Sequence, residues 1–406
     1  MKVVGIIAEF NPFHSGHRYL IEQAKAQTGA DYCIVVMSGS YVQRGTPSFM
    51  PKSIRIKAAL LSNCDLILEL PVSYSTASAE AFAYGGVSIL NALGVVDYVA
   101  FGSESGDISS LKECALNIQN PSKTSLLIIE EYLKQGLSFP AARTKAFPEH
   151  SAILQSPNNI LAVEYLKAIN TINSNLIPIT IKRKGTGFHD LTLNDFSSAS
   201  AIRNAFDHLE TTDNLEYDSI TGFPDYLSDV YRSEFKICWP IDYDDFSSLA
   251  NYLLITKTAD ELSSYQDMNI DIANRFKNYK NGFSNISDFL STIKTKELTY
   301  SRLSRGLLHS ILDLHDLTRN SNGLIPVPYT RILGFKSSAS ELMHEVSKQA
   351  QIPLINKVAD APKVLSKEAL NYLEATLNAD RIYAMIVKHK YNTKLKDSAT
   401  ISPIIL

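Results

Sequence analysis

The chain has 406 residues, of which 45% are hydrophobic and 20% charged, and its formal net charge is −3. At roughly 100–200 residues per domain, this length predicts two or three domains with substantial cores. The near-neutral total gives no sign of an overall basic nucleic-acid binder, although a neutral total can hide a local basic face. The N-terminus leads directly into a strand pattern without a signal peptide, and no apolar run approaches the roughly 18 residues of a membrane span. We therefore expect a cytoplasmic protein.

The four cysteines give no sign of a structural metal site or of disulfides. They are widely scattered and have neither the paired spacing of a zinc site nor the density of a secreted disulfide scaffold. We expect reduced core cysteines, and no metal ligands are predicted from the chain itself. The cysteines are Cys33, Cys64, Cys114 and Cys238.

In the first half of the chain, short apolar β-rich runs alternate with helical patterns. The expected strands are residues 3–8, 32–37, 66–71, 98–102 and 177–182. The expected helices are Arg18–Gln27, Lys52–Leu61, Ser78–Leu93, Asp107–Ile118, Asn159–Ile169 and Ser200–Leu209. Such alternation predicts a parallel sheet covered by helices on both faces, which is an α/β fold of the Rossmann-like nucleotide-binding type.

From about Phe223 onward the strand runs disappear and helical spacing takes over. Examples are FSSLANYLLI, SRLSRGLLHSILDL and KEALNYLEATLNADRIYAMIV. We therefore expect two domains, a nucleotide-binding domain over residues 1–215 and a mostly α-helical domain over residues 216–406.

The stretch FNPFHSGH, residues 10–17, occupies the turn between the first expected strand and its helix. In open α/β sheets this turn offers unpaired N–H groups and the positive end of a helix to an anion. Gly16 allows close approach of the backbone, and Ser15 is a candidate cap for the helix. His14 and His17 are expected to donate hydrogen bonds to phosphate oxygens, which suits nucleotidyl transfer at an α-phosphate. Without the surrounding pattern, a single histidine is equally well explained as a partly buried structural residue whose hydrogen bonds are satisfied within the protein.

The pattern H-x-G-H after the first strand resembles the signature of the nucleotidyltransferase superfamily. An ordered set of further motifs is more specific, and the whole set resembles the bacterial tRNA(Met) cytidine acetate ligase family. The motifs are EFNPFHSGHRYLIEQA, MSGSYVQRGTP, LILELPVSYSTASAEAFAYGGVSILNALG, AFGSESGD, SPNNILAVEYLKAI, IKRKGTGFHD, SSASAIR, SRLSRGLLHSIL and PYTRILGFKSSASELM.

This resemblance implies that the chain activates acetate with ATP as acetyl-adenylate and transfers the acetyl group to the wobble cytidine of elongator tRNA(Met), giving N4-acetylcytidine. His14 and His17 are the implied catalytic residues. Mg²⁺ is expected to be bound by the phosphates of ATP. The residues expected to contact ATP are Ile7, Ala8, Glu9, Phe10, Asn11, Phe13, His14, Gly16, His17, Gly102, Ser103, Asn158, Asn159, Arg183, Ser198 and Arg203. Helix capping is the competing interpretation for one of the two asparagines, and surface solvation for Arg203.

The acyl substrate is expected beside Gln43, Arg44 and Gly45, which follow the second strand and should face the same crevice as His14. The next helix begins with Pro51, Lys52 and Ser53, where the family tends to have an acidic residue before the lysine and an aromatic after it. This difference from the family pattern concerns the identity or positioning of the acyl substrate more than the binding of ATP.

The implied RNA contacts are Arg302, Arg305, Arg331 and Lys336 in the helical part. A basic residue on a helix is more often simply solvated. Two other functions stay open at this point: an adenylyltransferase for a small phosphate-bearing metabolite, and a non-catalytic RNA-binding or assembly factor on the same fold. No protein partner is inferred.

Overall fold

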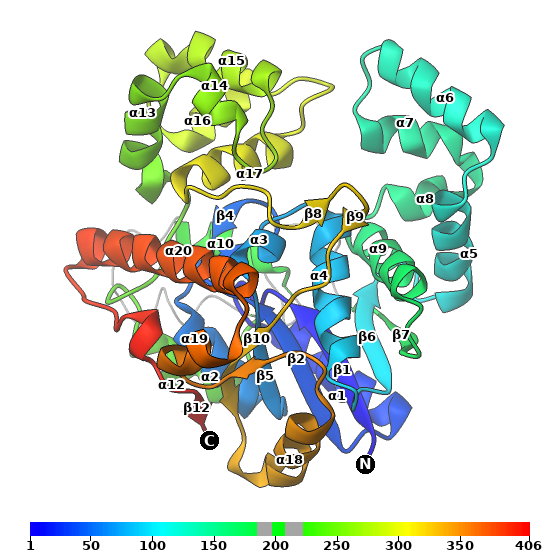
Figure 1. The fold of residues 1–406 in the computed structure, drawn as a ribbon, viewed down its shortest axis with the longest axis vertical. Helices are drawn as coiled ribbons and strands as arrows, with labels where there is room; N and C mark the ends of the chain where they lie inside the picture. The colour runs from blue at the N-terminus through cyan, green and yellow to red at the C-terminus, as the bar shows by residue number, and fades with distance from the viewer. Residues whose placement is uncertain (185–196, 208–221) are drawn as a thin grey trace.

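The computed structural model describes residues 1–184, 197–207 and 222–406. Its centre is an eight-stranded sheet in which seven strands follow the order β11-β10-β5-β2-β1-β6-β7 and β12 pairs with β10 (Figure 1). The strands of this sheet are β1 (Val3–Ala8), β2 (Tyr32–Ser38), β5 (Leu66–Leu70), β6 (Tyr98–Ser103), β7 (Ile177–Lys182), β10 (Thr330–Phe335), β11 (Leu354–Ile355) and β12 (Ile404–Ile405). Two small antiparallel pairs are β3 (Tyr41–Val42) with β4 (Thr46–Pro47), and β8 (Arg319–Asn320) with β9 (Gly323–Leu324).

The five strands from the first half of the chain are parallel, and their carboxyl ends meet at one edge of the sheet. β1 pairs with β2 on one side and with β6 on the other, and β2 and β6 pair outward with β5 and β7. The expected α/β fold with a mostly parallel sheet is confirmed. The predicted strand bounds agree with the observed ones to within one residue at each end.

Both faces of this sheet are buried, because alternate side chains along each strand enter different hydrophobic clusters. In β1, Val4 and Ile6 belong to one cluster, while Val3 and Ile7 belong to the other. Successive side chains of a strand point to opposite faces, so a strand that reads as continuously apolar must be covered on both sides. α1 (Ser15–Thr28) and α2 (Lys52–Leu61) cover the first face, and α4 (Ala79–Ala92) and α9 (Pro157–Ile172) cover the second.

Two groups of helices stand above the sheet in Figure 1. One is inserted between β6 and β7 and consists of α5 (Ile108–Gln119), α6 (Lys123–Lys134), α7 (Phe139–Ala146) and α8 (Ser151–Leu154). The other comprises α13 (Ser247–Thr256), α14 (Ala259–Ser263), α15 (Ile270–Tyr279), α16 (Ile286–Ile293) and α17 (Tyr300–Ile311). The remaining helices are α3 (Val72–Ser75), α10 (Ala199–Asp207), α12 (Ser228–Arg232), α18 (Ser340–Gln349), α19 (Ala361–Val364) and α20 (Lys367–Tyr391).

The C-terminal part is mostly helical, as expected, but the expectation that no strand follows residue 223 is wrong. β10 lies antiparallel to β5, and β11 and β12 pair with β10. The run TRILGF is rich in residues that suit a pleated surface, and it extends the sheet beyond β5. The C-terminal part of the chain therefore adds strands to the sheet that the N-terminal part forms. The domain boundary at residue 215 stays a prediction, since that position lies outside the described residues.

Candidate active site

The turn between β1 and α1 is organised by reciprocal hydrogen bonds between its two histidines and the backbone. His14 is the N-cap of α1, and its Nδ1 accepts from the N–H of Gly16 at 3.0 Å. His17, one turn into the helix, accepts from the N–H of His14 through its own Nδ1 at 3.2 Å. Helix N-termini leave such N–H groups without partners, so this arrangement satisfies two of them.

The same hydrogen bonds fix the protonation of both rings. A ring nitrogen that accepts from a backbone N–H cannot itself carry a proton, so Nδ1 is bare in His14 and in His17. In a neutral imidazole the proton then resides on Nε2. The turn therefore presents two Nε2–H donors, and both rings line the cavity at the carboxyl edge of β1.

Packing holds the two rings in place. Their centroids lie 3.9 Å apart, and Phe10 makes an edge contact with the ring of His17 at 5.0 Å. Phe10 and Phe13 are fully buried and contact each other at 4.8 Å. Phe10 also has a φ of 48°, a left-handed conformation that a bulky residue adopts only where its surroundings impose it. These two phenylalanines therefore support the histidines, and neither of them is among the residues that line the cavity.

Burial and neighbouring arginines keep the histidines neutral. Burial, together with the charges of Arg183 and Arg203, lowers the pKa of His14 to about 3. Burial and the proximity of His14 and Arg183 likewise lower the pKa of His17 well below its usual value. A neutral histidine still donates one strong hydrogen bond, so the positive charge of this site resides on its arginines and on Lys182 and Lys184.

The second loop of the site, residues 39–51, is tied to the first through Glu9 and Arg55. The carboxylate of Glu9 accepts from the N–H of Gln43 at 2.8 Å, and burial raises the pKa of this carboxyl group. Arg55 is fully buried on α2 and donates to the carbonyls of Glu9, Ser38, Gly39 and Met50. The guanidinium therefore holds the ends of β1 and β2 together. Sequence reasoning missed Arg55, although a single arginine among the apolar residues of IRIKAAL was a signal.

The residues expected at the acyl crevice, Gln43, Arg44 and Gly45, lie in the loop that packs against α17, and none of them is among the residues that line the cavity with His14. Gly45 has a φ of +77°, and a Cβ placed there would lie 2.5 Å from the backbone of Arg305. Ser304 fixes the same contact by donating its hydroxyl to the carbonyl of Gly45 at 2.8 Å. Gln43 donates its amide to the carbonyl of Ala77 at 3.1 Å. Only glycine fits this position, because it needs both the left-handed conformation and the close approach.

The opposite wall is formed by the ends of β6 and β7 and the start of α9. Glu104 and Asn159 bind each other reciprocally: the amide oxygen of Asn159 accepts from the N–H of Glu104 at 2.9 Å, and the carboxylate accepts from the N–H of Asn159 at 2.9 Å. Asn158 donates to the same carboxylate at 2.6 Å and lines the cavity. Ser103 is fully buried and bonded to Thr180. Asn159 and Ser103 thus shape the wall rather than face the cavity.

α10 brings Arg203 to the β1–α1 turn. Its N-terminus is fixed by Ser198, whose hydroxyl accepts from the N–H of Ala201 at 3.1 Å. Arg203 donates to the carbonyl of Asn11 at 2.6 Å, and the side chain of Asn11 accepts from the N–H of Phe49 at 2.6 Å. Asn11, Ser198 and Arg203 therefore join α10 to the turn without lining the cavity itself.

The cavity encloses about 1000 Å³, including its open mouth, at the carboxyl edge of β1, β6 and β7. Nine of the residues expected to contact ATP line it: Ile7, Ala8, Glu9, His14, Gly16, His17, Gly102, Asn158 and Arg183. Three further lining residues, Ile181, Lys182 and Lys184, belong to the motif IKRKGTGFHD, and the ones that the sequence reasoning did not single out are Tyr19, Leu20, Phe82, Phe101, Leu161 and Tyr165. The predicted motif IKRKGTGFHD continues past Lys184 into residues 185–190, which lie outside the described residues.

The four basic residues expected to contact RNA do not form one surface. Arg331 is buried and forms an ion pair with Glu69 at 3.1 Å, so we withdraw it from the RNA contacts. Arg305 is buried too and binds Asp267 through two nitrogens. Arg302 is exposed on α17. Lys336 follows β10, and its N–H donates to the carbonyl before β5, at the sheet edge opposite the cavity.

Two further features are absent from the described residues. Within residues 1–184, 197–207 and 222–406, no helix has the length and apolarity needed to cross a bilayer. The same ranges contain no group of three or more histidine, cysteine or acidic side chains placed to hold a metal ion.

Comparison with known proteins agrees with this geometry. Residues 1–398 match the family described as HIGH Nucleotidyl Transferase. The tRNA(Met) cytidine acetate ligase of Acetivibrio thermocellus is 34% identical over 418 aligned positions, covering 100% of both chains. The crystal structures of Thermotoga maritima TmcAL, one apo and one bound with alpha-thio ATP, superpose with TM-scores of 0.91 and 0.89 at 30% identity, again over 100% of both chains. The chain therefore belongs to the tRNA(Met) cytidine acetate ligase family of HIGH nucleotidyltransferases.

Proposed function

We propose that this protein is an ATP-dependent acetate ligase that forms acetyl-adenylate and transfers the acetyl group to the wobble cytidine of elongator tRNA(Met), producing N4-acetylcytidine. The observation that carries the proposal is the pair of neutral Nε2–H donors of His14 and His17, beside Arg183, in a cavity at the carboxyl edge of the sheet. Family membership supports it, as does the alpha-thio ATP bound by the Thermotoga maritima relative.

In the first step an acetate oxygen attacks the α-phosphorus of ATP, and the bond from that phosphorus to the bridging oxygen breaks. Pyrophosphate leaves with the electron pair. The Nε2–H groups donate to phosphate oxygens on which negative charge grows, while Arg183 supplies fixed positive charge. Gln43 and Gly45 border the space assigned to acetate, and Glu9 holds their loop through its hydrogen bond to Gln43.

Mg²⁺ is expected to bind the phosphates of ATP, where it neutralises charge and orients the triphosphate. Glu9 is the one acidic residue among those lining the cavity in the described part of the chain. A lone carboxylate fits a cation that is held mainly by phosphate oxygens and water.

In the second step the exocyclic amine of cytidine attacks the carbonyl carbon of acetyl-adenylate. The bond from that carbon to the phosphate oxygen breaks, AMP leaves, and the amine loses a proton. The mixed anhydride is unstable in water, so the base must enter the same cavity. An anticodon loop offers such an unstacked base at low cost. Because tRNA is a cytoplasmic substrate, we place the reaction in the cytoplasm.

The test is incubation of the protein with labelled acetate, ATP, Mg²⁺ and unmodified tRNA(Met), followed by digestion of the RNA to nucleosides. We expect label in N4-acetylcytidine and release of AMP and pyrophosphate. Omission of tRNA should leave acetate-dependent exchange of label between pyrophosphate and ATP. Exchange without any labelled nucleoside would refute RNA as the acceptor. No exchange and no labelled nucleoside would refute the ligase itself.

A further inference from the structure

A second and larger cavity lies on the other side of the loop over residues 39–51. It encloses about 2130 Å³, including its open mouth, and we call it the lysine groove. Its walls come from the start of α2, from α12 and the residues after it, from the C-terminal half of α20, and from the tail that follows α20. Its lining residues include Lys52, Lys57, Asp380, Lys388, Lys394 and Lys396.

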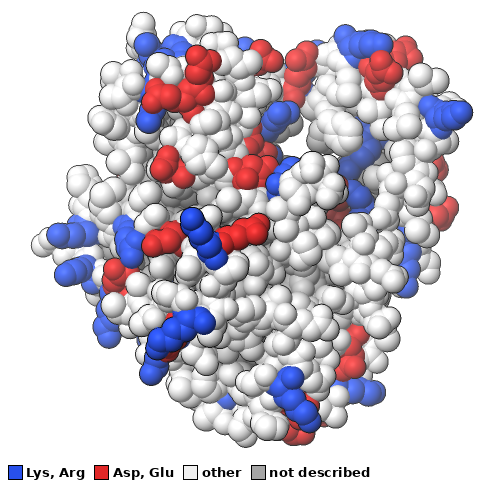
Figure 2. Space-filling view, in the orientation of Figure 1, with Lys and Arg blue, Asp and Glu red and all other residues white. Residues whose placement is uncertain are grey.

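Four lysines at the rim of the lysine groove have no ion-pair partner among the residues that the structure describes. They are exposed and come from three segments: Lys57 on α2, Lys388 in the last turn of α20, and Lys394 and Lys396 in the tail. Figure 2 shows basic side chains gathered along the left edge of the molecule, over the end of α20 and the tail. Unpaired cations on separate elements around one depression are suited to a ligand with several negative charges.

The acidic residues of the lysine groove do not cancel these charges. Asp380 forms an ion pair with Lys52, and Asp397 lies 3.7 Å from the guanidinium of Arg381. Only Asp229 and Glu234 remain against the four rim lysines.

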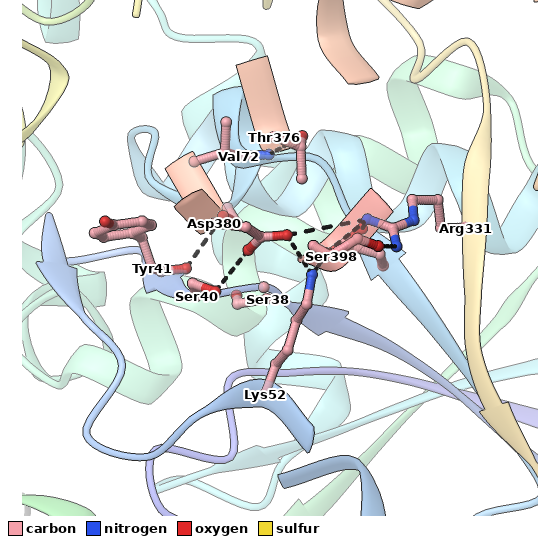
Figure 3. Close-up of polar contacts among 12 residues, drawn as sticks. Ser38, Ser40, Tyr41, Lys52, Val72, Arg331, Thr376, Asp380 and Ser398 are labelled. Carbon is pink, nitrogen blue, oxygen red and sulfur yellow. Dashed lines mark hydrogen bonds and ion pairs between the residues drawn. The ribbon is translucent and has the colours of Figure 1, made fainter. Parts of the chain in front are cut away.

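The floor of the lysine groove is a rigid polar cluster centred on Asp380 (Figure 3). The carboxylate accepts from the hydroxyl of Ser40 at 2.6 Å and from Lys52, and the guanidinium of Arg331 lies 4.0 Å from it. Arg331 in turn donates to the carbonyl of Ser398 at 2.9 Å. Although burial disfavours its charge, Lys52 and Arg331 lower the pKa of Asp380 below its usual value. The cluster joins α2, α20, β10, the tail and the 39–51 loop.

The lysine groove is also close to the active site along the chain. Ser40 belongs to its floor, and Gln43, three residues later, donates its N–H to Glu9 in the ATP cavity. Three residues of extended chain span at most about 10 Å. The floor of the lysine groove therefore lies within about 10 Å, along the chain, of the loop that we assign to acetate.

We propose that the lysine groove is the docking surface for the phosphodiester backbone of the RNA substrate. This inference rests on the proposed function and assigns its RNA contacts to Lys57, Lys388, Lys394 and Lys396. Its unpaired lysines lie on three separate segments, as a ligand with charges spaced along a chain requires. Apolar groups at its base, including Ile54, Met385 and Leu395, offer a surface for an unstacked base.

The test compares two triple variants of the full chain. The groove variant is Lys388→Gln, Lys394→Gln and Lys396→Gln. The control variant is Lys348→Gln, Lys357→Gln and Lys367→Gln, which removes three exposed lysines on α18, before α19 and at the start of α20. Each protein is titrated with unmodified tRNA(Met) at several salt concentrations, and acetate-dependent exchange between pyrophosphate and ATP is measured without RNA.

We expect the groove variant to bind tRNA at least about tenfold more weakly at 0.1 M salt. Its plot of log affinity against log salt should be less steep than that of the wild type by about 2 to 3 units, because each lost phosphate contact removes roughly 0.7–0.9 unit. The control variant should bind as the wild type does, and all three proteins should share the same exchange rate. An exchange rate lowered only in the groove variant would mean that these lysines support the site structurally, and the inference would fail.

A second variant separates charge from folding. The side chain of Met385 is 48% exposed, so Met385→Glu adds a negative charge to the lysine groove without leaving a cavity in the hydrophobic core. Tighter or unchanged RNA binding by Met385→Glu, or equal weakening in both triple variants, overturns the inference. If the wild type binds tRNA but does not acetylate it, the proposed function fails while the binding comparison still decides on the groove. If the wild type binds no tRNA at all, the groove assignment fails directly.

Discussion

In the proposed reaction, His14 serves as a helix cap and as a donor to phosphate, and two substitutions separate these functions. Its Nδ1 caps α1 by accepting from the N–H of Gly16, and its Nε2–H faces the cavity. Asparagine places an acceptor near the position of Nδ1 but has no group at Nε2. Glutamine reaches the position of Nε2 with an amide donor but is a poor N-cap. His14→Asn should therefore keep the cap and lose the phosphate donor, and His14→Gln should do the reverse.

The expected magnitudes follow from the single hydrogen bond that each variant loses. Loss of an N-cap acceptor costs about 1 kcal/mol of stability, so His14→Gln should unfold at lower urea concentration than the wild type. Loss of one preorganised donor to a developing charge costs roughly a hundredfold to a thousandfold in rate. His14→Asn should therefore show this loss in acetate-dependent exchange between pyrophosphate and ATP, with nearly unchanged stability.

The assay is the exchange reaction at saturating ATP and acetate, together with urea unfolding followed by circular dichroism. His14→Ala serves as a control that lacks both groups, and it should combine the two losses. If His14→Asn retained wild-type exchange, the imidazole would be a cap and nothing more. If His14→Gln were as inactive as His14→Ala, the donor at Nε2 would not be the group that matters.

Two further predictions concern pH and the acyl crevice. Because the pKa of His14 is about 3 in the folded chain against an ordinary value of 6.5, the unfolded chain binds the extra proton first as the pH falls. The free energy of unfolding should then decrease as the pH falls below 6.5. Measured by urea unfolding, its decrease from pH 7.5 to 5.0 should be about 2 kcal/mol smaller in His14→Asn than in the wild type. Equal decreases in the two proteins would contradict a neutral buried His14. Gly45→Ala should lower the unfolding temperature and abolish exchange, since its Cβ would lie 2.5 Å from the backbone of Arg305 at a φ of +77°; a normally active variant would show that this contact relaxes.

The sequence was sufficient for the parallel sheet, and it predicted half of the residues that line the cavity at the carboxyl edge of that sheet. Five apolar runs predicted the bounds of five strands to within one residue, because strands that are buried on both faces consist of unbroken hydrophobic segments. H-x-G-H identified the turn between β1 and α1, whose two histidines line the cavity. The protonation of His14 and His17 was beyond sequence reasoning, since it depends on which ring nitrogen meets a backbone N–H.

The interpretation of Arg331 shows where a local pattern misleads. Within PYTRILGFK it resembles a basic residue in an exposed turn, but Thr330, Ile332 and Leu333 around it are buried. The signal was the apolar character of those neighbours, which is typical of a strand. Its partner Glu69 lies more than 250 residues earlier, in β5. A pairing across that separation has no local signature. For the same reason, the sequence reasoning considered Lys388 with Lys390 as phosphate contacts but did not bring Lys388 together with Lys57, Lys394 and Lys396.

In the proposed reaction, charged arginines contribute to binding of ATP, and neutral histidines contribute to catalysis. Arg183 in the cavity wall and Arg203 beside the β1–α1 turn carry permanent charge, which would attract the triphosphate in the ground state and the transition state alike. Burial lowers the pKa of Arg183, so the charged form of its guanidinium is stabilised when the phosphates of ATP lie beside it. The histidines are neutral and held by the backbone, so they favour the oxygens on which charge grows without adding to the attraction for the ground state. Two more fixed cations in their place would hold pyrophosphate more tightly as well, and release of the product would slow.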